Sequence, residues 1–197
     1  MRDIYRMGER AGALLKARGE KIAVGETSAG GLISASLLAA PGASAYFAGG
    51  AITYSARSIT GLAGISIDEM RARGIRSSSE PYAEMLAEAI RQRHGGVTWG
   101  LSETGAAGPG GNGYGDASGH TCMAVAGPVR VVRTLETGLE ERVENMWRFA
   151  EATLALLVEV HDQRELERAL GLEQVIFDRL AAAVVAETET IRAAAEA

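Results

Sequence analysis

The chain has 197 residues, a formal net charge of −5, 47% hydrophobic residues and 25 glycines. This composition is typical of a globular α/β protein with one core and excludes a disordered chain. The acidic balance offers no basic patch, so neither nucleic acid nor a membrane surface is an expected partner. The single Cys122 has no disulfide partner, no apolar run reaches the length of about 18 residues that spans a bilayer, and the first residues do not resemble a signal peptide. We therefore expect a cytoplasmic protein.

Helical and strand patterns alternate along the chain. In chain order, they predict a helix at 3–17, a strand at 21–25, a helix at 30–40, a strand at 46–54, a short helical stretch from Ser55, a helical turn at 68–73, a helix at 79–94, strands at 97–102, 121–126 and 129–135, and a helix at 140–160. This alternation is typical of an α/β fold, a three-layer α/β/α sandwich with a mixed, mainly parallel sheet.

The C-terminal region carries a separate signal. A helical extension over 163–197 is expected beyond an α/β/α domain at 1–162, with a break at Gly171. Its apolar stripe consists of Leu172, Val175, Ile176, Leu180, Val184 and Ile191. Because an isolated amphipathic helix is marginal in water, this stripe must pack on its own domain or on another subunit. We favour the second alternative and expect a homo-oligomer built on a dimer.

The turn V-G-E-T-S-A-G-G at 24–31 is the first candidate for chemistry. It joins a predicted strand to a predicted helix and carries the hydroxyls of Thr27 and Ser28 at the strand end. Gly30 and Gly31 allow backbone amides to approach a ligand at the helix N-terminus. An ordinary tight turn between a strand and a helix has the same composition, so both interpretations stay open here.

A second glycine-rich segment, 105–119, follows the third predicted strand. Glycines at this density either point successive amides at an anion or make a loop mobile. The segment matches neither the P-loop nor the dinucleotide-binding pattern, and no Cys/His spacing fits zinc, so we expect no cofactor and no metal. Since ligands of open α/β sheets bind beyond the carboxyl ends of strands, both segments are expected to face one pocket.

Several blocks occur together, in order, between about residues 3 and 160. They are Glu26 with Gly30-Gly31, the run 41–47, Gly50, Thr53-Tyr54-Ser55, Ser79-Glu80, Thr104-Gly105 and 107–111. With these blocks the chain resembles the C-terminal domain of the competence/damage-inducible protein CinA, whose stand-alone relatives are nicotinamide mononucleotide deamidases. The resemblance implies the α/β/α fold, a cytoplasmic location and oligomerisation. It also implies a substrate site made of Glu26, Ser28, Gly30, Gly31, Ser55, Gly105, Gly108, Pro109, Gly110 and Gly111.

The chain departs from the family where the resemblance implies catalysis. Relatives use a serine nucleophile at the position of Thr27, a tyrosine at Tyr54 and a lysine at the position of Ile59. An isoleucine cannot take a proton from the nucleophile, and the added methyl of Thr27 restricts its side chain. The chain has only two lysines, Lys16 and Lys21. Relatives also show an Asp-Arg pair where this chain has Leu139 and Glu140.

Three functional hypotheses follow. The first is a degenerate site that binds a pyridine nucleotide or similar phosphate-bearing molecule with weak or no deamidase activity. The second is an active amidohydrolase in which Thr27 attacks, Tyr54 and His120 transfer protons, and glycine-loop amides hold phosphate or the oxyanion. His120 is also compatible with a structural role at a strand start. The third is that only the oligomeric scaffold is used.

Overall fold

The computed structural model describes the backbone of residues 4–195 and the side chains of residues 4–171. The chain divides into two compact units, residues 1–158 and 159–197, which are described separately. In chain order the elements are α1 (Ile4–Arg18), β1 (Ile22–Glu26), α2 (Leu32–Ala39), the 3-10 helix η1 (Ala43–Ala45), β2 (Phe47–Ile52), α3 (Ala56–Ser58), the π-helix η2 (Ile59–Ala63), α4 (Ile67–Ala72), α5 (Glu80–Arg93), β3 (Trp99–Ala106), β4 (His120–Ala126), β5 (Val131–Glu136) and α6 (Arg142–Ala195).

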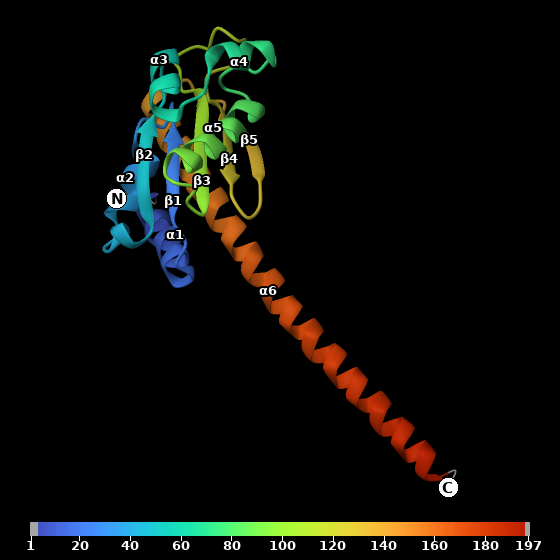
Figure 1. Cartoon of the computed structure of the whole chain (residues 1–197). Helices are drawn as coiled ribbons and strands as arrows, with labels where there is room; N and C mark the ends of the chain where they lie inside the picture. Colours follow the sequence, from blue (N-terminus) through green and yellow to red (C-terminus); the bar gives the residue numbers. More distant parts are fainter. Residues whose placement is uncertain (1–3, 196–197) are drawn as a thin grey trace. The chain divides into compact units, whose positions relative to one another are not determined.

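The first unit is built on a five-stranded sheet in the order β2-β1-β3-β4-β5 (Figure 1). β1 pairs in parallel with β2 and with β3, whereas β4 pairs antiparallel with β3 and with β5. The sheet is therefore mixed, as predicted. β3 reaches Ala106, beyond its predicted end at Ser102, so that Gly105 belongs to the strand and not to the loop.

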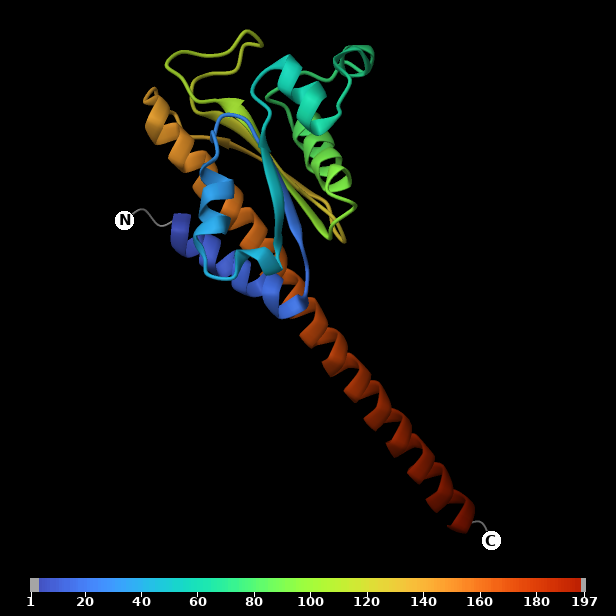
Figure 2. The same ribbon diagram turned by 60° about the vertical axis from the view of Figure 1, so that its left-hand side comes forward.

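Helices cover both faces of the sheet (Figure 2). α1, α2 and the first part of α6 lie on one face, and α5 lies on the other. Small residues allow the close approach of α5, because a side chain at Gly100 in β3 would overlap the carbonyl oxygen of Ala87. On the other face, α6 contributes the buried Phe149, Leu154 and Leu157 to the core. The predicted three-layer α/β/α fold is confirmed.

α6 differs from our prediction. We expected a break at Gly171, but the backbone is helical from Arg142 to Ala195. The physical reason is that one glycine inside a helix costs about 1 kcal/mol, too little to end a long helix. In the second unit, Leu166 and Leu170 are exposed. The stripe predicted at Leu172, Val175, Ile176, Leu180, Val184 and Ile191 lies outside the side chains that the structure describes.

Within the described part of the chain, none of the helices combines the length and the apolar character needed to cross a lipid bilayer.

Candidate functional site

A cavity of about 610 Å³ opens in the first unit, at the carboxyl ends of the parallel strands β1, β2 and β3. The lining comes from these strand ends, from the segment between β2 and α5, and from the glycine-rich loop. It consists of Thr27, Ser28, Thr53, Tyr54, Ala56, Ile59, Ile67, Met70, Arg71, Ile75, Arg76, Ser77, Ser78, Tyr82, Thr104, Gly105, Asn112 and Tyr114. A ligand site at this edge of the sheet is what the topology predicts.

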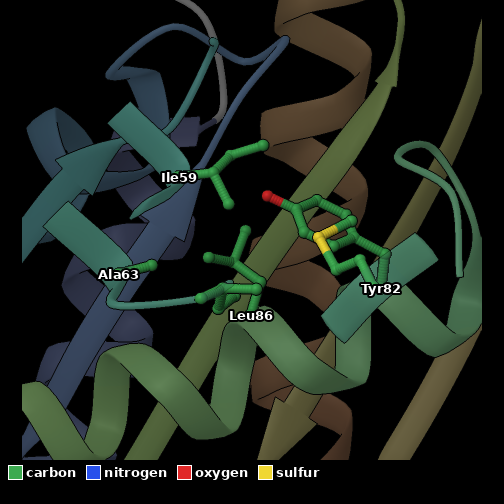
Figure 3. Close-up of a cluster of buried hydrophobic side chains, with 6 residues drawn as sticks. Ile59, Ala63, Tyr82 and Leu86 are labelled. Atoms are coloured by element: carbon green, nitrogen blue, oxygen red, sulfur yellow. The ribbon is translucent and has the colours of Figure 1, made fainter. Parts of the chain in front are cut away.

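The cavity has an apolar side. Ile59 is buried at the start of η2, where it belongs to one cluster with Met70, Tyr82 and Leu86. Figure 3 shows the side chains of this cluster, with the Tyr82 ring directed toward Ile59. The position where relatives carry a lysine is thus part of an apolar wall. A charged amine in this wall would be costly to bury without a partner.

The cavity lining also includes the two hydroxyls predicted from the first turn. The Thr27 hydroxyl donates to the backbone oxygen of Glu103 over 3.3 Å, and the Ser28 hydroxyl donates to the backbone oxygen of Gly105 over 2.6 Å. Both side chains are therefore oriented by β3. Thr27, Ser28 and Gly105 all line the cavity, as expected.

The α2 N-terminus, by contrast, already holds an anion of the protein itself. The fully buried Glu26 carboxylate accepts hydrogen bonds from the amides of Gly31, Ile33 and Ser34 and from the Ser34 hydroxyl. The amide of Gly30 donates to the Thr27 carbonyl. Glu26, Gly30 and Gly31 are absent from the lining, so our expectation that they bind substrate directly is not supported. A carboxylate at a helix N-terminus satisfies both the free amides and the helix dipole.

A second buried carboxyl group, that of Glu103, forms hydrogen bonds with the same turn. It accepts hydrogen bonds from the amides of Thr27 and Ala29 and from the Thr121 hydroxyl. Burial, opposed by these hydrogen bonds, raises the pKa of Glu103 to about 7. Glu103 therefore positions the segment that presents the Thr27 and Ser28 hydroxyls.

The glycine-rich loop contributes to the cavity, but not through the glycines that we expected. Its lining residues are Asn112 and Tyr114, and the segment 108–111 lies outside the lining. The Gly110 amide donates to the Glu140 carboxylate, and Arg142 donates to the Gly108 carbonyl. Like Gly31, Gly110 has its amide already paired within the protein, so the predicted amide cradle for phosphate gains no support from this loop.

An ion pair holds the far end of the loop. Arg76 donates two hydrogen bonds to Asp116, at 2.5 and 2.7 Å, and its guanidinium lies 5.5 Å from the centre of the Tyr114 ring. The Arg76 hydrogen bonds also lower the pKa of Asp116. Arg76 and Arg71 are the two cationic side chains in the lining, given the residues that the structure describes.

Tyr54 and Ser55 follow β2. Tyr54 lines the cavity, is 67% exposed, and its hydroxyl accepts a hydrogen bond from Arg142 over 3.3 Å. Ser55 is the N-cap of α3, where its hydroxyl accepts the Ser58 amide. The structure therefore brings Tyr54 together with Thr27 and Ser28, and gives Ser55 a role in starting a helix.

His120 lies outside the cavity lining. Its two ring nitrogens contact the Glu136 carboxylate and the Ser78 carbonyl, both of which are acceptors. Burial disfavours charge on this ring, but these two acceptors outweigh it and raise the pKa of His120. Because both ring nitrogens lie against protein acceptors and the residue does not line the cavity, the geometry favours a structural role of His120 over the predicted general base.

Comparison with known proteins agrees with this architecture. A profile of the CinA C-terminal domain matches residues 5–161. The chain belongs to the CinA C-terminal domain family. A CinA-like protein of Prochlorococcus marinus is 42% identical over 115 residues, which cover 58% of this chain and 26% of that protein. One from Anaeromyxobacter sp. strain Fw109-5 is 37% identical over 147 residues, covering 74% of this chain and 35% of that protein.

Solved structures of the CinA superfamily share the fold. A protein from Klebsiella pneumoniae superposes with a TM-score of 0.74 at 19% identity, over 82% of this chain and 99% of that protein. A competence/damage-inducible protein from Agrobacterium tumefaciens gives a TM-score of 0.72 at 22% identity, over 81% and 96% of the two chains. The CinA-like chain described here thus spans about a quarter to a third of these two curated relatives but nearly all of these solved structures.

Four residues of this CinA-like site escaped the sequence analysis. Thr53 was named only within a strand and the block Thr53-Tyr54-Ser55, Tyr82 lay only within the helix predicted at 79–94, and Arg76 and Glu103 were not singled out. Glu103 had a usable signal, since a carboxylate within a strand as buried as β3 needs buried partners. Tyr82 and Arg76 had none, because the sequence does not show which residues reach the cavity.

Proposed function

We propose that this CinA C-terminal domain protein binds a pyridine nucleotide or a similar phosphate-bearing molecule in the cavity, and that it has weak or no deamidase activity. One observation carries the proposal: among the described residues, the cavity lining contains no aspartate, glutamate, histidine, lysine or cysteine. A hydroxyl nucleophile such as Thr27 needs a neighbouring base to take its proton. Arg71 and Arg76 stay charged, and burial raises the pKa of Tyr82 to about 12.

The shape and chemistry of the cavity support binding. Its volume of about 610 Å³ falls within the range of about 300–1,000 Å³ that is usual for small-molecule sites. The apolar wall around Ile59 suits a planar ring, and guanidinium groups suit a phosphate. Because Arg76 is already paired with Asp116, Arg71 is the better candidate for the phosphate. Its exposed ion pair with Asp68 competes only weakly.

The alternative is an active amidohydrolase. It is favoured by the presence of Thr27 and Tyr54 in one cavity, and opposed by the hydrogen bonds that occupy His120. The two functions differ in what happens after binding, because the first predicts a stable complex and the second predicts release of ammonia.

Calorimetric titration with nicotinamide mononucleotide, together with an ammonia assay, tests the proposal. We expect binding without ammonia release, and about tenfold weaker binding in Arg71→Ala, the loss expected for one charge-assisted hydrogen bond. Arg73→Ala is the matched control, since Arg73 also lies in this segment and pairs with Glu69 but does not line the cavity. Turnover near or above about 1 per second would establish the amidohydrolase instead. Absence of binding would leave only the scaffold role.

A further inference from the structure

Two hydroxyls that line the cavity lack a good hydrogen-bond partner in the free protein. The side chains of Thr53 and Tyr82 are fully buried and both line the cavity. Apart from a weak contact with each other, neither hydroxyl has a hydrogen-bond partner among the residues that the structure describes. Buried polar groups are nearly always paired, so each exception calls for a partner from outside the chain, either a water molecule or a ligand.

The backbone holds both groups in place. The Thr53 amide donates to the Glu26 carbonyl over 2.8 Å, which fixes the residue just after β2. Tyr82 lies in the first turn of α5, where its amide donates to the Ser79 cap, and its ring is packed in the cluster with Ile59 and Met70. Figure 3 shows the oxygen of Tyr82 at the end of the ring that faces Ile59. The Tyr82 hydroxyl therefore lies beside Ile59, the position at which relatives carry the lysine.

The surroundings define what these hydroxyls can bind. Burial raises the pKa of Tyr82 to about 12, while the nearby Thr53 hydroxyl acts in the opposite direction. Tyr82 therefore stays protonated at neutral pH and can donate a hydrogen bond. Thr53 can accept one. Because the wall beside them is apolar, an uncharged group is favoured over an ionised one.

We infer that Tyr82 and Thr53 are specificity-determining residues that hold the uncharged, hydrogen-bonding end of the ligand, a carboxamide. The Tyr82 hydroxyl donates to the carboxamide oxygen, and the Thr53 oxygen accepts from its amino group. A carboxylate in the same place can also accept from both hydroxyls, but it brings a charge to the apolar wall and is therefore disfavoured. This inference rests on the proposed function, because it names the part of the nucleotide that enters the apolar side of the cavity.

The test compares Tyr82→Phe with Tyr46→Phe in the full chain. Tyr46 is also fully buried, but its hydroxyl donates to the Leu37 carbonyl away from the cavity. Binding of nicotinamide and of nicotinate is measured by ligand-observed NMR titration, and binding of the corresponding mononucleotides by calorimetry. Thermal unfolding of the free proteins is recorded in parallel.

We expect the wild type to prefer nicotinamide over nicotinate, and Tyr82→Phe to lose about tenfold in affinity for nicotinamide and most of that preference. Free Tyr82→Phe should unfold at nearly the same temperature, since the lost hydroxyl has no protein partner other than its weak contact with Thr53. Tyr46→Phe should unfold at a lower temperature and bind as the wild type does. A purely structural role of Tyr82 predicts instead that Tyr82→Phe unfolds at a lower temperature and binds nicotinamide as the wild type does.

The outcomes separate the two proposals. Binding of nicotinamide without binding of the mononucleotide removes the proposed nucleotide ligand and keeps the role of Tyr82. The inference is overturned if nicotinamide does not bind the wild type, if nicotinate binds as well as nicotinamide, or if Tyr82→Phe binds nicotinamide unchanged. Thr53→Val, which keeps the shape of the side chain, should weaken nicotinamide binding as well.

Discussion

Glu26 and Glu103 lie directly opposite each other where β1 pairs with β3, and both side chains are fully buried. They hold the two ends of one turn: Glu26 accepts the amides at the start of α2, and Glu103 accepts the amides of Thr27 and Ala29. Burial raises the pKa of Glu103, and the charge of Glu26 adds to the rise. The position of the Thr27 hydroxyl therefore depends on two carboxyl groups that are not themselves in the cavity.

The first prediction concerns the pH dependence of stability. The pKa of Glu103 rises from 4.5 to about 7 in the folded protein, so its contribution to stability is fully present below about pH 4.5 and is lost as the pH rises through about 7. We expect Glu103→Gln to flatten this fall, by an amount on the order of 2 to 3 kcal/mol between pH 4.5 and 8. Urea unfolding across this range measures it.

The glutamine matches the protonated carboxyl group, because its oxygen can accept hydrogen bonds from the same amides and its amino group can donate one to Thr121. Glu9→Gln on the exposed face of α1 is the control and should leave the pH profile of unfolding as in the wild type. A profile for Glu103→Gln that is as steep as that of the wild type would show that Glu103 does not titrate in this range.

The second prediction concerns the missing base. The double variant Ile59→Lys with Thr27→Ser should release ammonia from nicotinamide mononucleotide, whereas neither single variant should match it, because attack needs both an unhindered hydroxyl and a proton acceptor. The lysine should also lower the free energy of unfolding, since it is buried beside Met70 and Tyr82. Coupled ammonia assays and urea unfolding measure the two effects.

His120→Gln in the double-variant background is the matched control. It should leave the ammonia rate unchanged, because both ring nitrogens of His120 contact protein acceptors outside the cavity. A rate that falls with this substitution would return His120 to the mechanism.

The third prediction concerns the ion pair of the glycine-rich loop. Asp116→Asn should speed amide hydrogen exchange across residues 110–118 and weaken nucleotide binding, because Arg76 and Tyr114 lose the group that places them at the cavity. The loss in global stability should be only about 1 kcal/mol, since the Arg76 side chain is 40% exposed and its charge is partly screened. Asp68→Asn breaks the exposed pair with Arg71 and should leave loop exchange unchanged.

The fourth prediction concerns the C-terminal helix. A chain ending after His161 retains Phe149, Leu154 and Leu157, the part of α6 that belongs to the core of the first unit. We expect it to fold and to form a smaller assembly than the full chain, as measured by light scattering, because the remaining helix loses an apolar stripe that needs a partner. Assembly of unchanged size, or failure to fold, would refute the role of the extension in association.

The sequence predicted the framework of the site well because that framework depends on local patterns. Apolar periodicity located the strands, the Ser79 cap located α5, and strand topology then placed Thr27, Ser28 and Tyr54 at one edge of the sheet. These features are encoded by neighbouring residues, so they can be recognised without knowledge of the fold.

The hydrogen-bond partners that the fold brings together could not be predicted in the same way. Glycine patterns indicated amides available to a ligand, but the acceptors that occupy them, Glu26 for Gly31 and Glu140 for Gly110, depend on the packed structure. Gly171 shows that a single glycine does not reliably predict a helix end, since its cost is too small to interrupt a long helix. Tyr82 lies in the helix predicted at 79–94, yet the direction of its hydroxyl depends on side-chain packing.

The Glu26 carboxylate also determines how ligand preference can change in this protein. Backbone amides are present whichever side chain the residue carries. An anion site made of such amides therefore cannot be altered by substitution unless the fold changes. Here the protein's own acid occupies that site, so under the proposed function the recognition of phosphate depends on a side chain of the cavity, Arg71. If the proposed function holds, single substitutions at the rim of the cavity should change which charge the ligand carries without altering the fold.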